Sequence, residues 1–345
     1  MAGVRTWFST LFRRGIHGAN ISQQQKIEIL KFANEKGEYQ RRPSSFRDSI
    51  SSEPGAKFAP EKNRYHLYVS YACPWAHRTL IVRELKGLQD ILPVSVVHWH
   101  MDANGWRFAS KDDPCEGATS DQVYGVQRLK ELYFKAEPEY EGRFTVPVLW
   151  DTKLETVVNN ESSEIIRIFN EEFDSIIDEK YRGLTFYPDS LKSKIDEINP
   201  WIYDNINNGV YKSGFATKQE PYETNVKALF EHLDKVEKVL GEQFKKGSKY
   251  LVGDQLTEAD IRLFTTIIRF DPVYVQHFKC NLGMIRFDFP NLHKWVRHLY
   301  WEVPGFKETT NFDHIKFHYT KSHIAINPHS ITPLGPVPNI LPLDA

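Results

Sequence analysis

The sequence predicts an α/β domain followed by an all-α domain. Strand-like and helix-like patterns alternate between residues 63 and 175, whereas from residue 191 onward the periodicity is helical. The length of 345 residues also suits two ordinary domains with extensions. A formal net charge of -1 gives no reason to expect nucleic acid as a partner, and no apolar run approaches the roughly 20 residues that span a bilayer. A small-molecule partner is therefore expected.

The first residues have the composition of an organelle-targeting peptide. No Asp or Glu occurs between residues 1 and 27, where arginines are interleaved with apolar residues. We predict a presequence over 1–25 and import into mitochondria, and the alternative is an untargeted terminus with a cytoplasmic location. A short helix is expected at 20–35, and residues 26–62 are expected to form an irregular extension or lid.

The segment 63–175 follows the order β-α-β-α-β-β-α. The expected elements are a strand at 65–69, a helix at about 75–86, a strand at 93–99, a helix at about 122–136, strands at 146–150 and 154–158, and a helix at about 161–172. This is the order of a thioredoxin-like domain, an α/β layer in which the turn after the first strand carries the functional thiol.

The segment 190–325 is predicted to be entirely helical. Its clearest apolar stripe has helical spacing and consists of Val226, Leu229, Phe230, Leu233, Val236 and Leu240. A capping box over Thr257–Asp260 predicts the start of a central helix. Residues 326–345 are rich in proline and are expected to be extended rather than packed.

The turn between the first strand and the first helix holds the most informative residues, CPWAHR from Cys73 to Arg78. Pro74 suits the first helical position because its missing N–H would have no partner there, which puts Cys73 at the N-cap. Backbone amides and the helix dipole favour a thiolate at that position, so we expect a lowered pKa and a nucleophile. The competing interpretation is a small buried core residue. Ala76 stands where a redox pair would have its second cysteine, so Cys73 has no local disulfide partner.

Two further segments offer contacts for a peptide-like ligand. Val146-Pro147 opens a strand beside the Cys73 turn, and in an edge strand the Val146 N–H and C=O could pair with an extended tripeptide. Its X-Pro bond could be cis. Glu161 and Ser162 open the next helix, where hydroxyls, amides and the dipole suit a carboxylate and Glu161 suits an ammonium group. An ordinary capping box is the alternative for this second segment.

Together these motifs resemble a glutathione transferase of the cysteine type. The resemblance is carried by Cys73-Pro74-Trp75-Ala76, Val146-Pro147, Glu161-Ser162 and the helical second half. Separate blocks closely resemble the Xi class, the glutathionyl-hydroquinone reductases: Asn104 to Trp106, Asn207 to Tyr211, Arg269 to Tyr274, and Asn311 to Tyr319. The resemblance covers roughly residues 25–330. It implies a glutathione transferase fold, glutathione as co-substrate, glutathionylated quinols as substrates, no metal, and a homodimer.

The resemblance also implies a role for each matched residue. Cys73 would be the nucleophile. Glutathione would be held by Trp106, Arg143, Val146, Glu161 and Ser162. The quinone oxygens would be contacted by Tyr211, Tyr274 and Tyr319, of which Tyr211 and Tyr319 would also take part in catalysis. The alternative for each tyrosine is a core aromatic residue with a satisfied hydroxyl.

The reaction expected from these roles removes glutathione from a glutathionyl-hydroquinone. It passes through a Cys73–glutathione mixed disulfide and gives hydroquinone and oxidised glutathione. The nearest alternative is an omega-like thioltransferase or dehydroascorbate reductase, which uses the same thiol. The alternative from another class is a non-catalytic regulatory or interaction protein with the same fold.

The remaining cysteines and the histidines give weaker signals. Cys73, Cys115 and Cys280 are odd in number and widely spaced, which fits neither a disulfide framework nor a zinc pattern and favours a reducing compartment. Cys115 is expected in an exposed loop, and Cys280 is expected to be partly buried, with a distant resolving role left open.

Two histidine pairs have spacings that can serve a metal site. His98 and His100 alternate along a strand, and His314 and His318 stand four residues apart on a helix. Neither pair has an obvious third ligand, so structural roles are expected. His77 follows Cys73 by one turn, where it could face the thiol or pack, and it is left unassigned.

Overall fold

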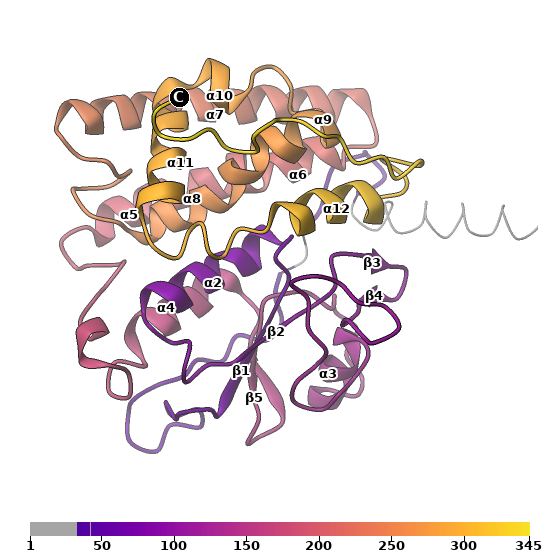
Figure 1. Cartoon of the computed structure of the whole chain (residues 1–345), viewed down its shortest axis with the longest axis vertical. Helices are drawn as coiled ribbons and strands as arrows, with labels where there is room; N and C mark the ends of the chain where they lie inside the picture. Colours follow the sequence, from indigo (N-terminus) through magenta and orange to yellow (C-terminus); the bar gives the residue numbers. More distant parts are fainter. Residues whose placement is uncertain (1–32, 42) are drawn as a thin grey trace, which may run out of the picture.

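The computed structural model describes residues 33–41 and 43–345. The predicted presequence and most of the predicted helix at 20–35 lie outside these residues. The described end of that helix, residues 33–35, is not helical, because Ala33 pairs with Tyr39 across a tight turn. The two predicted domains are present, with the strands in one half of the molecule and a helical bundle in the other (Figure 1). Within the described part, no helix is both long enough and apolar enough to cross a membrane.

The first domain is built on a mixed four-stranded sheet. Its elements are β1 (Tyr65–Val69), α2 (Pro74–Leu85), β2 (Val94–Val96), β3 (Met101–Asp102), β4 (Gly105–Trp106), α3 (Leu129–Ala136), β5 (Val148–Asp151), β6 (Thr156–Asn159), α4 (Ser162–Glu171) and the short η1 (Glu179–Tyr181). The strand order is β2-β1-β5-β6, in which β2 is parallel to β1 and the other two pairings are antiparallel. The predicted thioredoxin-like order is confirmed, with β3 and β4 as an added hairpin.

One predicted helix begins later than expected. The pattern predicted a helix at 122–136, but α3 starts only at Leu129. Residues 122–128 form a loop instead, because the buried Asp121 carboxylate accepts hydrogen bonds from the backbone amides of Val123, Tyr124 and Val126. A carboxylate that binds the amides just after it offers the chain an alternative to the helical hydrogen bonds.

The second domain contains only helices and loops in the described chain. Its elements are α5 (Lys192–Ile202), the π-helical η2 (Tyr203–Asn207), α6 (Gly209–Gly214), α7 (Gln219–Lys245), α8 (Glu258–Arg269), the π-helical η3 (Phe270–Tyr274), α9 (Val275–His277), α10 (Ile285–Asp288), α11 (Pro290–Glu302) and α12 (Phe312–Ser322). The predicted apolar stripe supplies the buried face of α7. The capping box at Thr257 and Asp260 opens the buried central helix α8, as predicted.

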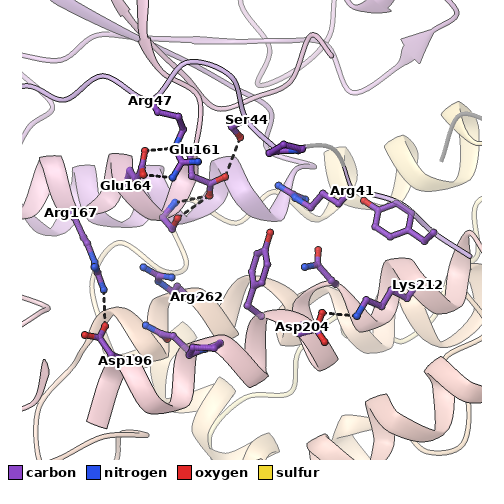
Figure 2. A pocket seen from close by; sticks show the side chains of 17 residues that line it. Arg41, Ser44, Arg47, Glu161, Glu164, Arg167, Asp196, Asp204, Lys212 and Arg262 are labelled. Carbon is purple, nitrogen blue, oxygen red and sulfur yellow. Dashed lines mark hydrogen bonds and ion pairs between the residues drawn. The ribbon is translucent and has the colours of Figure 1, made fainter. Parts of the chain in front are cut away.

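The two domains meet along α2 and α4. In Figure 1 these helices lie between the sheet and the bundle, and α2 packs against both α4 and α8. The start of α2 is therefore buried even at polar positions such as His77 and Arg78. Beside this contact, a cavity of about 690 Å³ opens between α4 on one side and α5, η2 and α6 on the other (Figure 2).

Both terminal extensions are bound to the domains. The predicted lid runs along β6, where Arg47 pairs with Asn159 in an isolated bridge. The tail at 326–345 is extended, as expected, but the expectation that it would not pack is wrong. Arg286 donates hydrogen bonds to tail carbonyls, as does the Trp301 indole, and Ile340 is buried. An extended chain leaves its carbonyls unpaired, and α10 and α11 supply the donors.

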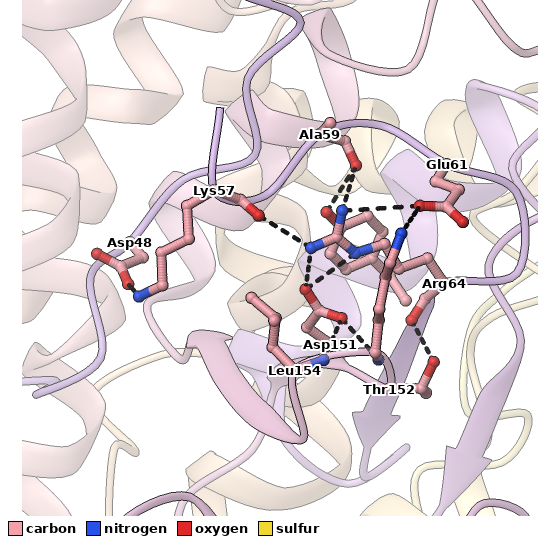
Figure 3. Close-up of polar contacts among 10 residues, drawn as sticks. Asp48, Lys57, Ala59, Glu61, Arg64, Asp151, Thr152 and Leu154 are labelled. Carbon is pink, nitrogen blue, oxygen red and sulfur yellow. Dashed lines mark hydrogen bonds and ion pairs between the residues drawn. The ribbon is translucent and has the colours of Figure 1, made fainter. Parts of the chain in front are cut away.

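A buried ion pair fixes the chain that leads into β1. Arg64 Nη2 and Nε donate to Asp151 Oδ2 at 2.6 and 3.0 Å, and the two side chains are 6% and 0% exposed. The guanidinium also donates to the carbonyl of Lys57, at 2.9 Å, so it joins the extension to the sheet (Figure 3).

Removing one member of this pair should strongly destabilise the protein. Asp151→Ala should lower the free energy of unfolding by about 3–5 kcal/mol, because it leaves the buried cation with only the half-exposed Glu61, 3.7 Å away, as an anion. The exposed pair of Lys57 and Asp48, also drawn in Figure 3, provides the control. Asp48→Ala should cost less than about 1 kcal/mol. Urea titration measures both values, and equal losses in the two variants would contradict the assignment.

Candidate active site

Cys73 is the N-cap residue of α2, as predicted. Its backbone is extended, with φ -76° and ψ 120°, and the helix begins at Pro74. The side chain is half-buried, and the thiol donates to the carbonyl of Val146 with 3.5 Å between sulfur and oxygen. The thiol therefore lies between the start of a helix and the chain that enters β5.

The pKa of the Cys73 thiol differs from the expectation in sign. Burial raises the pKa above its ordinary value, and this is the largest effect. The backbone amides of Ala76 and Trp75 lower the pKa, as the N-cap position predicts, and the charges of Arg269 and Arg41 act in the same direction. The predicted contribution of the helix start is confirmed, but the predicted net lowering is wrong because desolvation outweighs it.

Val146 adjoins the thiol in a different setting from the one expected. The Val146-Pro147 peptide bond is cis. The strand it precedes is not an edge strand, because β5 lies between β1 and β6. The ladder between β1 and β5 reaches only as far as Val148, so Val146 lies before the paired part of the strand. Because it lies outside the ladder, the Val146 backbone is suited to pairing with a short extended peptide. The sequence predicted the same pairing, but for an edge strand.

Glu161 and Ser162 begin α4 as predicted. Glu161 is the N-cap, and its carboxylate accepts hydrogen bonds from the amide and hydroxyl of Ser163 and from the hydroxyl of Ser44. Burial acts to raise the pKa of Glu161, but the Ser163 amide and the Arg41 charge outweigh it and hold the pKa below its usual value. Glu161 thus provides a stable anion, and the buried Ser162 hydroxyl lies 3.5 Å from Arg78 Nη1.

The interdomain cavity opens directly beside Glu161. Figure 2 shows Glu161 and Arg41 on its wall, with Asp204 and Lys212 across from them. Arg41 comes from the N-terminal extension and lies over the Trp75 ring at 4.0 Å. Its charge acts on both Cys73 and Glu161, so the thiol and the start of α4 belong to one site. The cavity gives this site an opening at the Glu161 end.

Trp106 lies in β4, and Arg143 lies in the loop before β5. Trp106 is largely buried and stacks on His318 of α12, with ring centroids 4.8 Å apart and planes at 24°. Arg143 is half-buried. Burial raises the pKa of Tyr39 on the N-terminal extension, and the charge of Arg143, like that of Arg41, opposes this rise. Both residues thus lie at contacts between the first domain and other parts of the chain.

The three predicted tyrosines form one hydrogen-bonded cluster. The Tyr319 hydroxyl lies 2.6 Å from that of Tyr211 and 3.0 Å from that of Tyr274. The cluster brings together α6, η3 and α12, which are far apart in sequence. An ionised Cys73 would act on Tyr211 and Tyr319, raising the pKa of both, so the cluster lies close to the thiol.

The tyrosines remain protonated at neutral pH. Burial raises the pKa of Tyr319 to about 12, and it raises the pKa values of Tyr211 and Tyr274 well above their usual value. Each hydroxyl therefore keeps its proton and can donate a hydrogen bond.

Two cations of the site were not found from the sequence. Arg41 lies in an extension without periodic structure, and no local pattern marks it. Arg269 is the last residue of α8, and it appeared only within a block of family resemblance. His77, to which the sequence assigns no role, is buried. Its Nδ1 lies 3.0 Å from Arg269 Nη1, and its Nε2 lies 2.9 Å from Thr309 Oγ1.

The other two cysteines are less accessible than expected. Cys115 is half-buried rather than exposed, and its sulfur lies 3.6 Å from His314 Nε2. Cys280 is fully buried, and burial raises its pKa far above the ordinary value. A buried, protonated thiol is unsuited to resolving a disulfide.

The histidine pairs make structural contacts. The His100 amide donates to His98 Nδ1 at 2.8 Å, and His314 and His318 each bind a backbone carbonyl from the first domain. Across residues 33–41 and 43–345, no group of three His, Cys, Asp or Glu side chains is arranged to hold a metal ion.

The fold and the N-cap thiol define a glutathione transferase. Residues 72–172 match the family model for the glutathione S-transferase N-terminal domain, and residues 219–298 match the model for its C-terminal domain. The chain belongs to the glutathione S-transferase family, an enzyme family, and it has the glutathione transferase fold.

Similar proteins indicate which class of glutathione transferase this chain belongs to. The chain is 58% identical to glutathione S-transferase omega-like 2 of Schizosaccharomyces pombe, over 90% of this chain and 97% of that protein. It is 52% identical to the glutathionyl-hydroquinone reductase YqjG of Escherichia coli, over 87% and 89%. The solved structure of the Xi glutathione transferase ECM4 from Saccharomyces cerevisiae in complex with glutathione matches with a TM-score of 0.86 and 51% identity, over 89% of this chain and 99% of that one. The predicted membership of the Xi class is confirmed.

Proposed function

We propose that this enzyme is a glutathione-dependent reductase of glutathionyl-hydroquinones. The observation that carries the proposal is the cluster of three protonated tyrosine hydroxyls beside a single N-cap thiol. The similarity to a glutathionyl-hydroquinone reductase supports it.

Glutathione would lie between the Cys73 thiol and the start of α4. Its γ-glutamyl carboxylate meets the Ser162 end of the helix, and its ammonium group meets Glu161, whose pKa is held low. Its cysteinyl amides pair with the Val146 backbone, which precedes the sheet ladder. Trp106 and Arg143 hold the remaining backbone and the glycyl carboxylate. Because Glu161 borders the cavity, the γ-glutamyl end faces its opening.

The chemistry is two thiol exchanges. The ring carbon that bears the sulfur first takes up a proton while a ring hydroxyl loses its own, which gives a keto tautomer. The Cys73 thiolate then attacks the glutathione sulfur, the carbon–sulfur bond breaks, and its electron pair passes through the ring to the carbonyl oxygen, which takes up a proton. Hydroquinone leaves, and a Cys73–glutathione disulfide remains. A second glutathione thiolate attacks this disulfide, releases the Cys73 thiolate and leaves as oxidised glutathione, so the second glutathione is the reductant.

The tyrosines assist the step in which the carbon–sulfur bond breaks. An aryl carbon is a poor leaving group, and the carbon–sulfur bond breaks more readily when the ring is in a keto tautomer. The carbonyl oxygen of that tautomer becomes a hydroxyl oxygen as the bond breaks. Tyr211 and Tyr319 give up the hydrogen bond they share and donate to this oxygen, which stabilises the charge that develops there. Tyr274 supports Tyr319 through their shared hydrogen bond.

A comparison of three substrates tests the proposal. Turnover should be highest on a glutathionyl-menadiol-type hydroquinone and lower on a glutathione mixed disulfide and on dehydroascorbate, because only the first uses the tyrosine cluster. Initial rates at equal glutathione concentration give kcat/KM for each. Preference for the mixed disulfide or dehydroascorbate would identify an omega-like thioltransferase instead. The homodimer and mitochondrial import stay predictions.

A further inference from the structure

Arg269 is a buried cation without an anion. The residue is fully buried, and its guanidinium contacts only neutral acceptors. Nε donates to the carbonyl of Ala72 at 3.0 Å, Nη2 to that of Tyr71 at 2.8 Å, and Nη1 to that of Thr265 at 2.7 Å. Within the described chain, no Asp or Glu side chain forms an ion pair with it.

The fourth contact of Arg269 fixes a neutral histidine. An arginine nitrogen can only donate, so His77 Nδ1 accepts the hydrogen bond from Nη1 at 3.0 Å and carries no proton. The proton is therefore on Nε2, which reaches Thr309 Oγ1, and the Thr309 hydroxyl in turn donates to the carbonyl of Gly305. His77, the Thr309 hydroxyl and the Gly305 carbonyl are all neutral, so this network supplies no anion to Arg269.

A buried charge of this kind needs a reason. Moving a guanidinium out of water is costly, and buried charges in proteins are normally paired. A glutamine amide has only two N–H donors for these four acceptors, so the guanidinium is explained by its hydrogen bonds but its charge is not. The charge itself is explained if an anion forms nearby during the reaction, and the carbonyls of Tyr71 and Ala72 hold Arg269 against the turn that ends at Cys73.

The groups that face the thiol come from several elements. Arg41 of the N-terminal extension and Arg269 of α8 are the cations whose charges act on Cys73. Tyr211 of α6 and Tyr319 of α12 face it as protonated hydroxyls. Arg41 already acts on the Glu161 carboxylate and lies beside the cavity, which leaves Arg269 as the cation without a competing anion.

We infer that Arg269 is the internal counter-ion of the Cys73 thiolate and the residue that holds the Cys73 turn against the helical domain. The inference rests on the nucleophilic role of Cys73 in the proposed function. When the second glutathione releases Cys73 as a thiolate, its negative charge forms next to a cation that is already in position and need not reorganise. Arg269 acts through the turn and through its charge, so it is a positioning residue.

The test measures the ionisation of Cys73 directly. The rate of iodoacetamide alkylation at Cys73, located by peptide mass spectrometry, is followed against pH in the wild type, Arg269→Gln and Arg269→Lys. The Gln variant should raise the apparent pKa by about one or more, so that alkylation below the pKa slows about tenfold. The Lys variant keeps the charge, so its alkylation rate should depend on pH as in the wild type, although it loses the paired hydrogen bonds to the carbonyls of Tyr71 and Ala72.

A matched control separates charge from destabilisation. Arg262 lies on the same helix, is also largely buried, and pairs with Glu258. Arg262→Gln should lower stability and leave the Cys73 profile unchanged. Coincident profiles for Arg269→Gln and wild type would overturn the inference, as would equal shifts in the Gln and Lys variants. If the Gln variant does not fold, a rise of about one or more in the Lys variant overturns it. No quinone substrate is used, so these outcomes are independent of the proposed reaction.

Discussion

Replacing Cys73 with serine should abolish turnover, with a loss of about 1000-fold or more in kcat/KM for a glutathionyl-hydroquinone. The thiol is the nucleophile in both exchanges, and a serine hydroxyl at the same N-cap would not ionise near neutral pH. Intact-mass measurement after exposure to the substrate gives a second readout. The wild type should gain one glutathionyl group, and Cys73→Ser should gain none.

Cys115 supplies the control for this experiment. Its half-buried thiol contacts His314 rather than any predicted site residue, so Cys115→Ser should keep both the turnover and the mass gain. Turnover that survives in Cys73→Ser would contradict the mechanism. It would favour the competing interpretation of Cys73 as a small buried core residue.

Tyr211→Phe and Tyr319→Phe should each reduce kcat on a glutathionyl-hydroquinone by about 100-fold. Each substitution removes one hydroxyl that stabilises charge on the quinone oxygen, and loss of such a donor costs about 100- to 1000-fold. Glutathione affinity should stay near the wild-type value, because the predicted glutathione contacts come from the first domain. Steady-state kinetics and titration calorimetry with glutathione measure the two effects separately.

The same substitutions should matter little for disulfide substrates. A glutathione mixed disulfide has a sulfur leaving group and needs no keto tautomer, so both Phe variants should retain most activity on it. Tyr300→Phe is the structural control: this tyrosine is also buried in the helical domain but packs against Phe312, away from the cluster. Unchanged turnover of the hydroquinone substrate in both Tyr211→Phe and Tyr319→Phe would contradict the tyrosine role.

Much of the fold follows from local patterns. The start of α2 at Pro74, the buried stripe of α7 and the capping box of α8 each depend on residues within a few turns of one another, and all are present as predicted. The predictions of the start of α3 and of an unpacked tail were wrong for two different reasons. The start of α3 depends on a carboxylate that competes with helical hydrogen bonds, and the packing of the tail depends on donors from α10 and α11.

The site divides in the same way. Local sequence predicted that Cys73 and Glu161 would stand at helix starts and that Val146-Pro147 would lie beside the thiol, because each is defined by its position in an element. Family resemblance was needed to select the tyrosines, since their hydroxyls meet only when α6, η3 and α12 pack together. Arg41 and the opening beside Glu161 became visible only with the extension in place.

The order of the elements and the placement of Cys73 at a helix start follow from local sequence, because backbone geometry and capping act over a few residues. The ionisation of that thiol depends on the packing of distant segments. Burial between two domains raises its pKa, and Arg269, brought to the Cys73 turn from a distant helix, opposes this effect. Desolvation and Coulomb interactions depend on distance in space, so the residues that tune the nucleophile are fixed by packing rather than by neighbours in the chain.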